Sequence, residues 1–188
     1  MDLNFLLPFM ALIGVIVGFI LNWFKEFIQN KPRIKVSLND SGGKFNYYKT
    51  VKNNIGGVWH ERSIPEEARF LKLYNLINVY NIGKLSSGIK GVDVEVCVND
   101  YCRYFTPELK IDGKVNKDFT FNVPTGSICT LEINLEIKKD ENTQFLFNED
   151  VIIDVDSKNR LIFILILTDI YNKKHKVTIE PLAFATAE

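Results

Sequence analysis

Two cysteines near the middle of the chain have a spacing at which their thiols could act together. Cys97 and Cys102 are separated by four residues, the outer limit for a pair of zinc ligands, and no second close pair completes a zinc site. Asn99-Asp100 between them is typical of a two-residue β-turn, which would place Cys97 opposite Cys102 in a hairpin. The Cα atoms of such a pair lie about 4.5–5.5 Å apart, within reach of a disulfide. The sequence leaves three interpretations of the pair: a redox-responsive disulfide, two ordinary thiols, or zinc ligands. Of these we do not favour the zinc site, and we predict that the protein binds no metal and no other cofactor.

The side chains that usually catalyse reactions form no recognisable pattern. The two histidines, His60 and His175, have no ligand spacing with each other, and no G-x-S-x-G motif of a hydrolase nucleophile is present. One acidic cluster lacks the glycine and the distal glutamate of a calcium loop and is explained by a turn at residues 156–159; it comprises Glu149, Asp150, Asp154 and Asp156. We therefore predict that the protein is not an enzyme.

The stretch YYKTVKNNIGGVWHERSIPEE (residues 47–67) has the composition of a binding surface. Aromatic rings beside Lys and Arg can stack on a base and hold its phosphates, and the same residue types dominate protein-interface hot spots. We predict an irregular loop over residues 51–67, and such loops are often functional in compact domains. Alternatively, the aromatic residues plug the open end of the domain. The candidate binding residues are Tyr47, Tyr48, Lys49, Lys52, Trp59, His60 and Arg62.

An apolar segment at the start of the chain is long enough to cross a bilayer. No charged residue lies between Asp2 and Lys25, and about 20 helical residues span a hydrocarbon core of about 30 Å. A secretory signal would begin with basic residues and end at a small-residue cleavage site, and neither feature is present. We predict a permanent anchor at residues 1–30, which contacts the bilayer through residues 3–24, and a separate domain at residues 31–188.

The positive charges around this segment predict its orientation. Lys25, Lys31, Arg33 and Lys35 follow the segment closely, and no basic residue precedes it. Cytoplasmic flanks carry the Lys and Arg excess, so we predict a single-pass protein of a bacterial inner (plasma) membrane. Its N-terminus would lie outside and its C-terminal domain in the cytoplasm. An odd count of three cysteines agrees with that reducing compartment.

One face of the apolar segment could hold a second helix. Gly14, Gly18 and Asn22 recur at four-residue intervals, so that small residues allow close approach and the Asn amide could hydrogen-bond across the pair. This pattern predicts a homodimer, although glycine is also common in membrane helices that do not pair. The overall charge is balanced at 23 basic and 23 acidic residues, so bulk nucleic-acid binding is not expected.

The rest of the chain alternates apolar and polar residues with period two, which predicts strands separated by Gly, Pro, Asn and Asp turns. We expect an all-β antiparallel sandwich after one transmembrane helix. Leu161 to Leu167 are seven consecutive apolar residues, which suit a strand buried on both faces. The strands are expected near residues 33–39, 44–50, 69–81, 89–98, 101–105, 118–123, 128–139, 151–155, 160–169 and 175–180.

Two stretches resemble immunoglobulin-like and fibronectin-like sandwich domains. They are LINVYNIGKLSSGIKGVDVEV (residues 76–96), where a strand ends in N-x-G, and FNVPTGSICTLEINLEI (residues 121–137), where a Pro/Gly turn opens a strand. The resemblance implies an immunoglobulin-like architecture and carries no catalytic motif.

Three functions fit these observations. The first is a cytoplasmic binding or scaffold module that places a partner protein at the membrane. The second is a ligand-gated membrane effector, which senses a small anionic, nucleotide-like signal as in antiphage defence. The third is an envelope-binding domain outside the cytoplasm, which requires the charge rule to fail.

Overall fold

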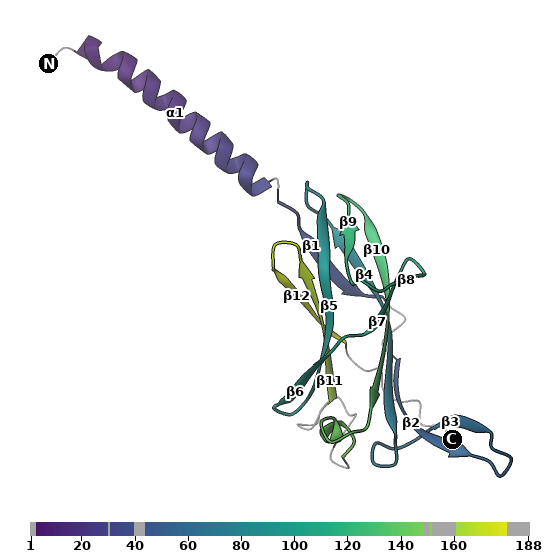
Figure 1. Ribbon diagram of the computed structural model, residues 1–188. Helices are drawn as coiled ribbons and strands as arrows, with labels where there is room; N and C mark the ends of the chain where they lie inside the picture. The colour runs from purple at the N-terminus through teal and green to yellow at the C-terminus, as the bar shows by residue number, and fades with distance from the viewer. Residues whose placement is uncertain (1–2, 30, 40–43, 149–150, 152–160, 180–188) are drawn as a thin grey trace.

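A single long helix leads into two antiparallel β-sheets in the computed structural model of the chain (Figure 1). The structure describes residues 3–29, 31–39, 44–148, 151 and 161–179. Helix α1 runs from Leu3 to Gln29 and ends shortly before Pro32, which cannot continue a helix. The predicted strand at 151–155, the turn at 156–159 and the four acidic residues of the proposed cluster lie outside the described residues, apart from Val151.

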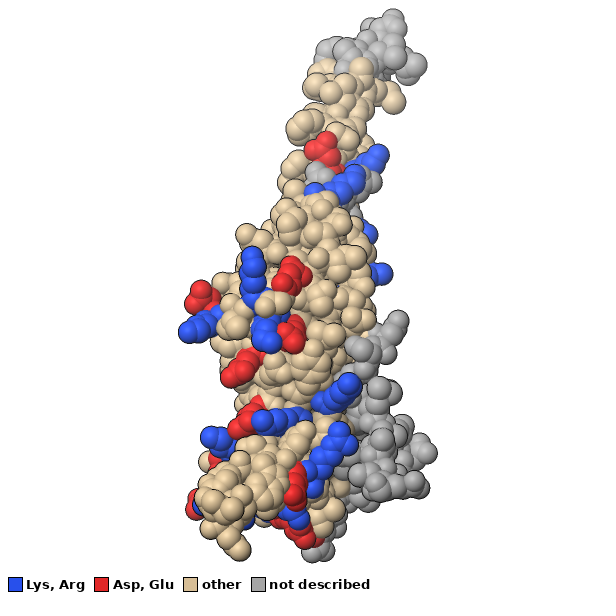
Figure 2. Space-filling model, turned by 90° about the vertical axis from the view of Figure 1, so that its right-hand side faces the viewer, with Lys and Arg blue, Asp and Glu red and all other residues tan. Residues whose placement is uncertain are grey.

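The apolar stretch of α1 is exposed along its described length. Phe9–Phe27 is long and apolar enough to cross a membrane, and none of it is buried. In Figure 2 the described part of the helix is uncharged until its sandwich end, where basic and acidic side chains begin. A membrane anchor and a signal sequence would both have this form.

The first sheet contains seven strands around the long pair β4 and β10. The order is β3-β2-β4-β10-β7-β8, and β1 pairs with β4 beyond the end of β2. Figure 1 shows β4 and β10 running the length of the domain. The strands are β1 (Ile34–Leu38), β2 (Lys44–Lys52), β3 (Val58–Arg62), β4 (Phe70–Asn81), β7 (Glu108–Ile111), β8 (Lys114–Asn116) and β10 (Ile128–Lys138).

The second sheet contains five strands and faces the first. Its order is β12-β11-β5-β6, and β9 pairs with β5 on the same edge as β6. One 3-10 turn, η1 (Gln144–Leu146), follows β10. The strands are β5 (Ser87–Val98), β6 (Tyr101–Phe105), β9 (Phe121–Val123), β11 (Leu161–Asp169) and β12 (Lys174–Ile179).

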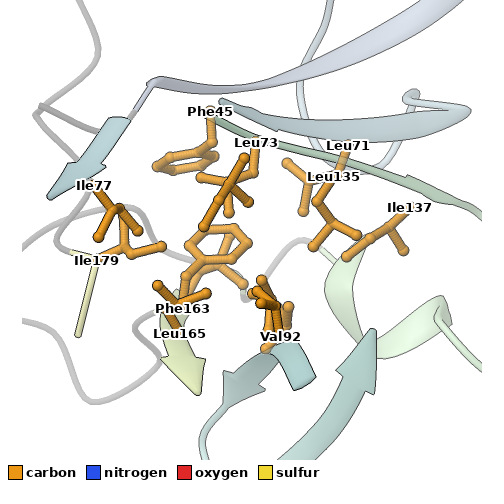
Figure 3. Packing of buried hydrophobic residues seen from close by; sticks show 14 of the residues in the cluster. Phe45, Leu71, Leu73, Ile77, Val92, Leu135, Ile137, Phe163, Leu165 and Ile179 are labelled. Carbon is orange, nitrogen blue, oxygen red and sulfur yellow. The ribbon is translucent and has the colours of Figure 1, made fainter. Parts of the chain in front are cut away.

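The hydrophobic core lies between the sheets, where period-two alternation turns one set of side chains inward (Figure 3). Phe163 of β11 is fully buried, and its ring centroid lies 5.4 Å from that of Phe45 of β2 in the opposite sheet. The strand β11 is buried on its core face, whereas on its outer face Ile166 is buried and Ile162 and Ile164 are only half-buried. The expectation that both faces are buried is therefore confirmed at Ile166 and wrong at Ile162 and Ile164.

Most predicted strands are confirmed, and three short ones were not expected. The turn at Asn99-Asp100 sets Val98 opposite Tyr101 and Cys97 opposite Cys102, as predicted. The strands that the sequence did not indicate are β3, β7 and β8, which are three to five residues long. Strands of three to five residues are too short to show a clear alternation.

Asn81, the last residue of β4, ties together the loops at the end of the sandwich nearest α1. Its side-chain oxygen accepts hydrogen bonds from the backbone N–H groups of Arg33 (3.3 Å) and Gly83 (3.0 Å). Its amide nitrogen donates to the carbonyls of Leu85 (2.8 Å) and Val123 (2.9 Å). All four hydrogen-bonding positions of this buried amide are therefore used.

The segment between α1 and β1 packs directly on the loop after β4. The Ile82 N–H donates to the Arg33 carbonyl at 3.0 Å. A Cβ atom on Gly83 would lie 2.4 Å from the Arg33 nitrogen, so only glycine fits without moving the backbone. The N-x-G sequence at 81–83 therefore fixes where the chain enters the sandwich.

Asp169 organises the turn between β11 and β12. Its carboxylate accepts hydrogen bonds from the N–H groups of Tyr171 and Lys173, both at 2.9 Å, and lies 3.0 Å from the His175 ring. Burial alone would raise the pKa of Asp169, but the hydrogen bonds with His175 and the backbone outweigh it and lower this pKa. The turn is thus held by an ionised, almost fully buried carboxylate.

Acid is expected to weaken the fold through Asp169. Because its folded-state pKa is lower than the unfolded value of about 3.9, its contribution is present above about pH 4 and is lost as the pH falls through the folded-state pKa. Asp169→Asn should lower the melting temperature at pH 7 and flatten its decline between about pH 5 and pH 3. The melting temperature of the full chain in detergent across this range measures the effect. Asp100→Asn, at an exposed turn, is the control, and an equal flattening there would contradict the assignment.

Candidate functional site

The β2–β3 hairpin extends past the end of the sandwich that lies away from α1 (Figure 1). We call residues 49–62 the arm. Every residue of β3 is exposed, and large apolar side chains on or beside the arm are exposed to solvent at Ile55 (93%), Val58 (56%), Trp59 (41%) and Ile64 (53%). A local group of exposed apolar residues of this kind is typical of an interaction surface.

The tip of the arm is an ordered turn. The side-chain oxygen of Asn53 accepts hydrogen bonds from the backbone N–H groups of Ile55 (3.2 Å) and Gly57, which is the Asx-type turn that Asn favours. Gly56 has a φ of +86°, a conformation that glycine adopts without strain. The NNIGG sequence therefore closes a hairpin, and the predicted irregular loop is wrong over residues 51–52 and 58–62, which are strand.

The structure divides the seven predicted binding residues among three locations. Val51 pairs with Trp59 and Thr50 pairs with His60, so alternation puts these two aromatic rings on opposite faces of the arm. Tyr48, Lys52, His60 and Arg62 share the outer face, while Lys49 and Trp59 lie on the other face. Trp59 and Arg62 therefore cannot hold one ligand between them, because their side chains lie on opposite faces of the arm.

Tyr47 is not a surface residue, which corrects the prediction. Only 1% of it is exposed, its hydroxyl donates to the Leu146 carbonyl at 2.7 Å, and its ring packs edge-on against Phe147. Burial raises the pKa of the Tyr47 hydroxyl well above its usual value. The inward position follows from period two, because Tyr47 and Phe45 lie on the same face of β2.

The outer face of the first sheet carries a shallow groove next to the arm. Its volume is about 670 Å³, and its lining includes Tyr48, Arg62, Lys72, Glu108 and Glu136. At one side Tyr48 stacks on Phe70 with ring centroids 5.5 Å apart, and His60 meets the same ring edge-on at 4.7 Å. These aromatic rings pack against one another as a fixed cluster.

The charges in this groove balance one another. Lys72 forms an ion pair with Glu136 at 3.1 Å, and Lys110 forms one with Glu132 at 3.0 Å on the same face. Lys49, on the arm's other face, pairs with Glu67 at 3.1 Å. Blue and red side chains are correspondingly interspersed on the face seen in Figure 2. The groove therefore offers an anionic ligand no large excess of positive charge.

The outer edge of β3 carries backbone groups that point away from the sheet. Asn53 N–H donates to the Gly57 carbonyl and Ser63 N–H to the Tyr47 carbonyl, so odd-numbered residues form the hydrogen-bonded pairs of this hairpin. The N–H and C=O groups of Val58, His60 and Arg62 therefore face the open edge. Among the described strands, β3 pairs only with β2.

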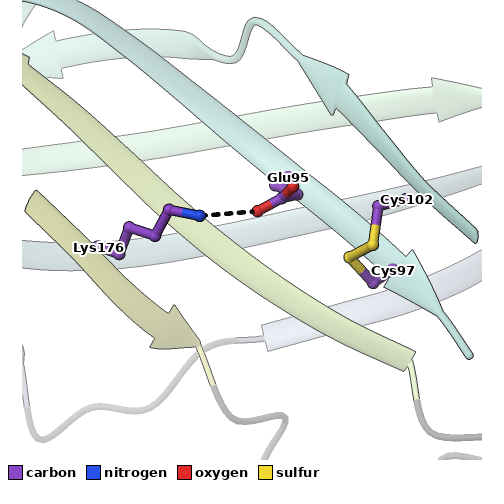
Figure 4. The surroundings of a disulfide bond; sticks show 4 residues. All are labelled: Glu95, Cys97, Cys102 and Lys176. Atoms are coloured by element: carbon purple, nitrogen blue, oxygen red, sulfur yellow. Dashed lines mark hydrogen bonds and ion pairs between the residues drawn. A yellow bond between two sulfur atoms is a disulfide. The ribbon is translucent and has the colours of Figure 1, made fainter. Parts of the chain in front are cut away.

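Cys97 and Cys102 form a disulfide, and their Cα atoms are 4.1 Å apart (Figure 4). A disulfide between these two cysteines is one of the interpretations that the sequence left open, and redox activity of the pair stays a prediction. The Glu95 carboxylate lies near the two sulfurs and forms an ion pair with Lys176 at 3.5 Å. Both sulfurs are used by the S–S bond, so this group offers one carboxylate and no thiolate to a metal. Cys129 is buried and free.

The predicted helix-pairing face is open in this single chain. Outside the adjacent residues and the backbone of the surrounding helical turns, no atom of the chain lies within 4 Å of a Cβ built on Gly14 or Gly18, and Asn22 is exposed. Self-association through these residues stays a prediction.

Three exposed apolar residues of the arm region were not among the predicted binding residues. Ile55, Val58 and Ile64 stand within a polar, glycine-containing stretch, and that contrast was the signal that could have identified them. The open edge of β3 could not be recognised from sequence, because it depends on which strand lies beside it.

Comparison with known proteins does not assign the chain to a family. No family model matches the chain, and no curated protein matches it. Among solved structures, it is similar to an uncharacterized β-sandwich protein from Clostridium difficile 630, with 12% identity and a TM-score of 0.34. That match covers 80% of this chain and 90% of the other. The two antiparallel sheets described above make this chain a β-sandwich in its own right.

Proposed function

We propose that the chain is a single-pass membrane protein whose immunoglobulin-like sandwich binds a partner protein through the arm. The observation that carries this proposal is the combination of an open β3 edge with exposed Ile55, Val58 and Trp59 beside it. An edge strand supplies backbone hydrogen bonds to an added strand, and neighbouring side chains supply specificity. The arm lies at the end of the sandwich away from α1, where a partner has access (Figure 1).

The orientation proposed for this module is cytoplasmic, at the inner membrane. The basic residues Lys25, Lys31, Arg33 and Lys35 flank the sandwich side of α1, and this charge bias supports that side. The Cys97–Cys102 disulfide favours an oxidising compartment instead, and it would support an envelope domain. We give the flanking charges more weight, because transient or redox-sensing disulfides also occur in reducing compartments.

Photo-crosslinking in cells tests the partner and its side of the membrane. A benzophenone amino acid replacing Ile55, at the exposed tip, should yield a discrete adduct with one protein, identified by mass spectrometry. His60→Pro should abolish the adduct, because proline removes the N–H that faces the open edge while leaving the pairs with β2 intact. His60→Ala retains that N–H and is the matched control, in which the adduct should persist.

Each result of this experiment has a definite meaning. Equal adducts in the His60→Pro and His60→Ala chains would contradict strand addition, and no adduct would contradict the arm as a binding surface. A partner resident in the cytoplasm supports the orientation, whereas a secreted or envelope partner would reverse it.

A nucleotide-sensing effector is the second candidate, and the groove beside Tyr48 and Phe70 is the observation that favours it. Under this alternative, cyclic nucleotides would raise the melting temperature of the purified full chain, and Arg62→Ala would remove that shift. We rank it second because Glu108 and Glu136 share the lining with Arg62 and Lys72.

A further inference from the structure

We propose that the end of the sandwich nearest α1 is seated in the headgroup region of an anionic bilayer. The contact surface consists of three loops, residues 82–86, 124–127 and 170–173, which we call the helix-proximal loops. This inference rests on the proposed membrane anchoring, and it adds a second, independent contact between the protein and the lipid.

Pairing places these loops at the same end as the exit of α1. Ile34, the first residue of β1, pairs with Asn81, and Tyr80 pairs with Ile128, so the loop after β4 and the turn before β10 lie beside the start of β1. The Ile170 N–H donates to the Gly88 carbonyl at 2.9 Å, which brings the third loop to the start of β5. In Figure 1 all three loops lie at the helix end of the domain.

Two of these loops expose large apolar side chains that take no part in the core. Ile82 and Leu85 are 54% and 48% exposed, and Ile170 and Tyr171 are 50% and 60% exposed. Aliphatic residues with an aromatic ring are the side chains that settle at the membrane interface. Their exposure to water is unfavourable unless another apolar phase covers them.

The charges at this end suit an anionic surface. The helix-proximal loops contain Lys84 and Lys173 and no Asp or Glu, and Asp169 beside them is buried within its turn. The other acidic residues near this end are Glu26, which lines the recess described below, and Asp112, whose carboxylate accepts a hydrogen bond from the Thr130 N–H near the start of β10. The loops at the opposite end, residues 63–69, 99–100 and 139–143, have an acidic excess, with two basic residues, Arg69 and Lys139, against five acidic ones, Glu66, Glu67, Asp100, Asp140 and Glu141. An anionic leaflet would therefore attract the first end and repel the second.

The depth of the loops matches the interfacial end of α1. Trp23 and Phe27 stack 5.9 Å apart, and Lys31 lies 4.2 Å above the Phe27 ring, an arrangement typical of the headgroup level. Trp23, Phe27, Leu85 and Tyr171 line one common recess of about 680 Å³. The hydrogen bonds of Arg33 with Asn81 and Ile82 prevent the sandwich from moving far from this level.

Fluorescence quenching by brominated lipid tests the seating. The full chain is placed in nanodiscs containing phosphatidylglycerol, in three forms with one tryptophan each. Trp59→Phe leaves Trp23 as the membrane reference, and Trp23→Phe leaves Trp59 as the reference for the distant arm. The third form carries Trp23→Phe and Trp59→Phe together with Leu85→Trp. A second version of this form carries Tyr171→Trp instead of Leu85→Trp, so that the test does not depend on the folding of one variant.

The two references give every outcome a meaning. We expect the tryptophan at position 85 or 171 to be quenched at least about half as strongly as Trp23, and Trp59 to be unaffected. Lys84→Glu with Lys173→Glu should weaken the quenching, as should replacing phosphatidylglycerol by phosphatidylcholine. Quenching of Trp23 but not of positions 85 and 171 would overturn the seating and leave the anchor standing. An unquenched Trp23 would overturn the anchor and the seating together.

Discussion

Phe163→Ala is expected to lower the free energy of unfolding by about 3–5 kcal/mol, the range for removing a buried phenylalanine ring. Phe163 of β11 is fully buried and meets Phe45 across the sandwich, so the ring joins the two sheets (Figure 3). The core is close-packed, and the space vacated by the ring would fill only partly. Chemical denaturation of the full chain in detergent, followed by the β-sheet circular dichroism signal, measures the loss.

Ile162→Ala is the matched control for this substitution. Ile162 is the adjacent residue of β11, and its side chain lies half-buried on the outer face of the same sheet. The expected loss is less than half that of Phe163→Ala, because the Ile162 side chain buries less apolar area in the folded protein than the Phe163 ring does. Equal losses would show that the two faces of β11 are buried alike, contrary to the structure.

Asn81→Ala is expected to cost about 2–4 kcal/mol, because it leaves four backbone groups in three segments without their partner. The substitution leaves the Arg33 and Gly83 N–H groups and the Leu85 and Val123 carbonyls without the side-chain amide. Asn81→Asp should be at least as harmful, since a carboxylate cannot donate to the two carbonyls and would bury a charge. Denaturation of the full chain again measures the effect.

Asn78→Ala in the same strand is the control for Asn81→Ala. Asn78 is half-buried on the outer face and accepts one hydrogen bond, from the Thr130 hydroxyl at 3.1 Å. Its loss should be about 1 kcal/mol or less. If both substitutions cost the same, the structural role assigned to Asn81 is wrong.

The sequence predicted the long strands well because their two faces differ in environment. β4, β5 and β10 each alternate between core and surface, so period two is visible in their residues. The hairpin around Asn99-Asp100 was also predictable, because a two-residue turn fixes its own register. Local chemistry determined these features.

The candidate site was predicted less well, because its geometry depends on contacts between distant residues. Both faces of β3 are exposed, so its residues show no alternation that would identify a strand. Tyr47 and Tyr48 are adjacent and chemically alike, and alternation puts them on opposite faces of β2, with Tyr47 in the core beside Phe45. The position of Asn81 was visible as N-x-G, but its partners come from three other segments.

The entry of the chain into the sandwich has a mechanical consequence. β1 follows α1 directly, and five consecutive pairs from Ile34–Asn81 to Leu38–Ile77 join it to β4. A force along the strand axis, between α1 and the distant arm, would load these pairs in shear, so that they resist together. The same force applied across the strands would separate the pairs one after another. Tension between the two ends of the molecule would therefore pass through its longest sheet along the direction in which that sheet is strongest.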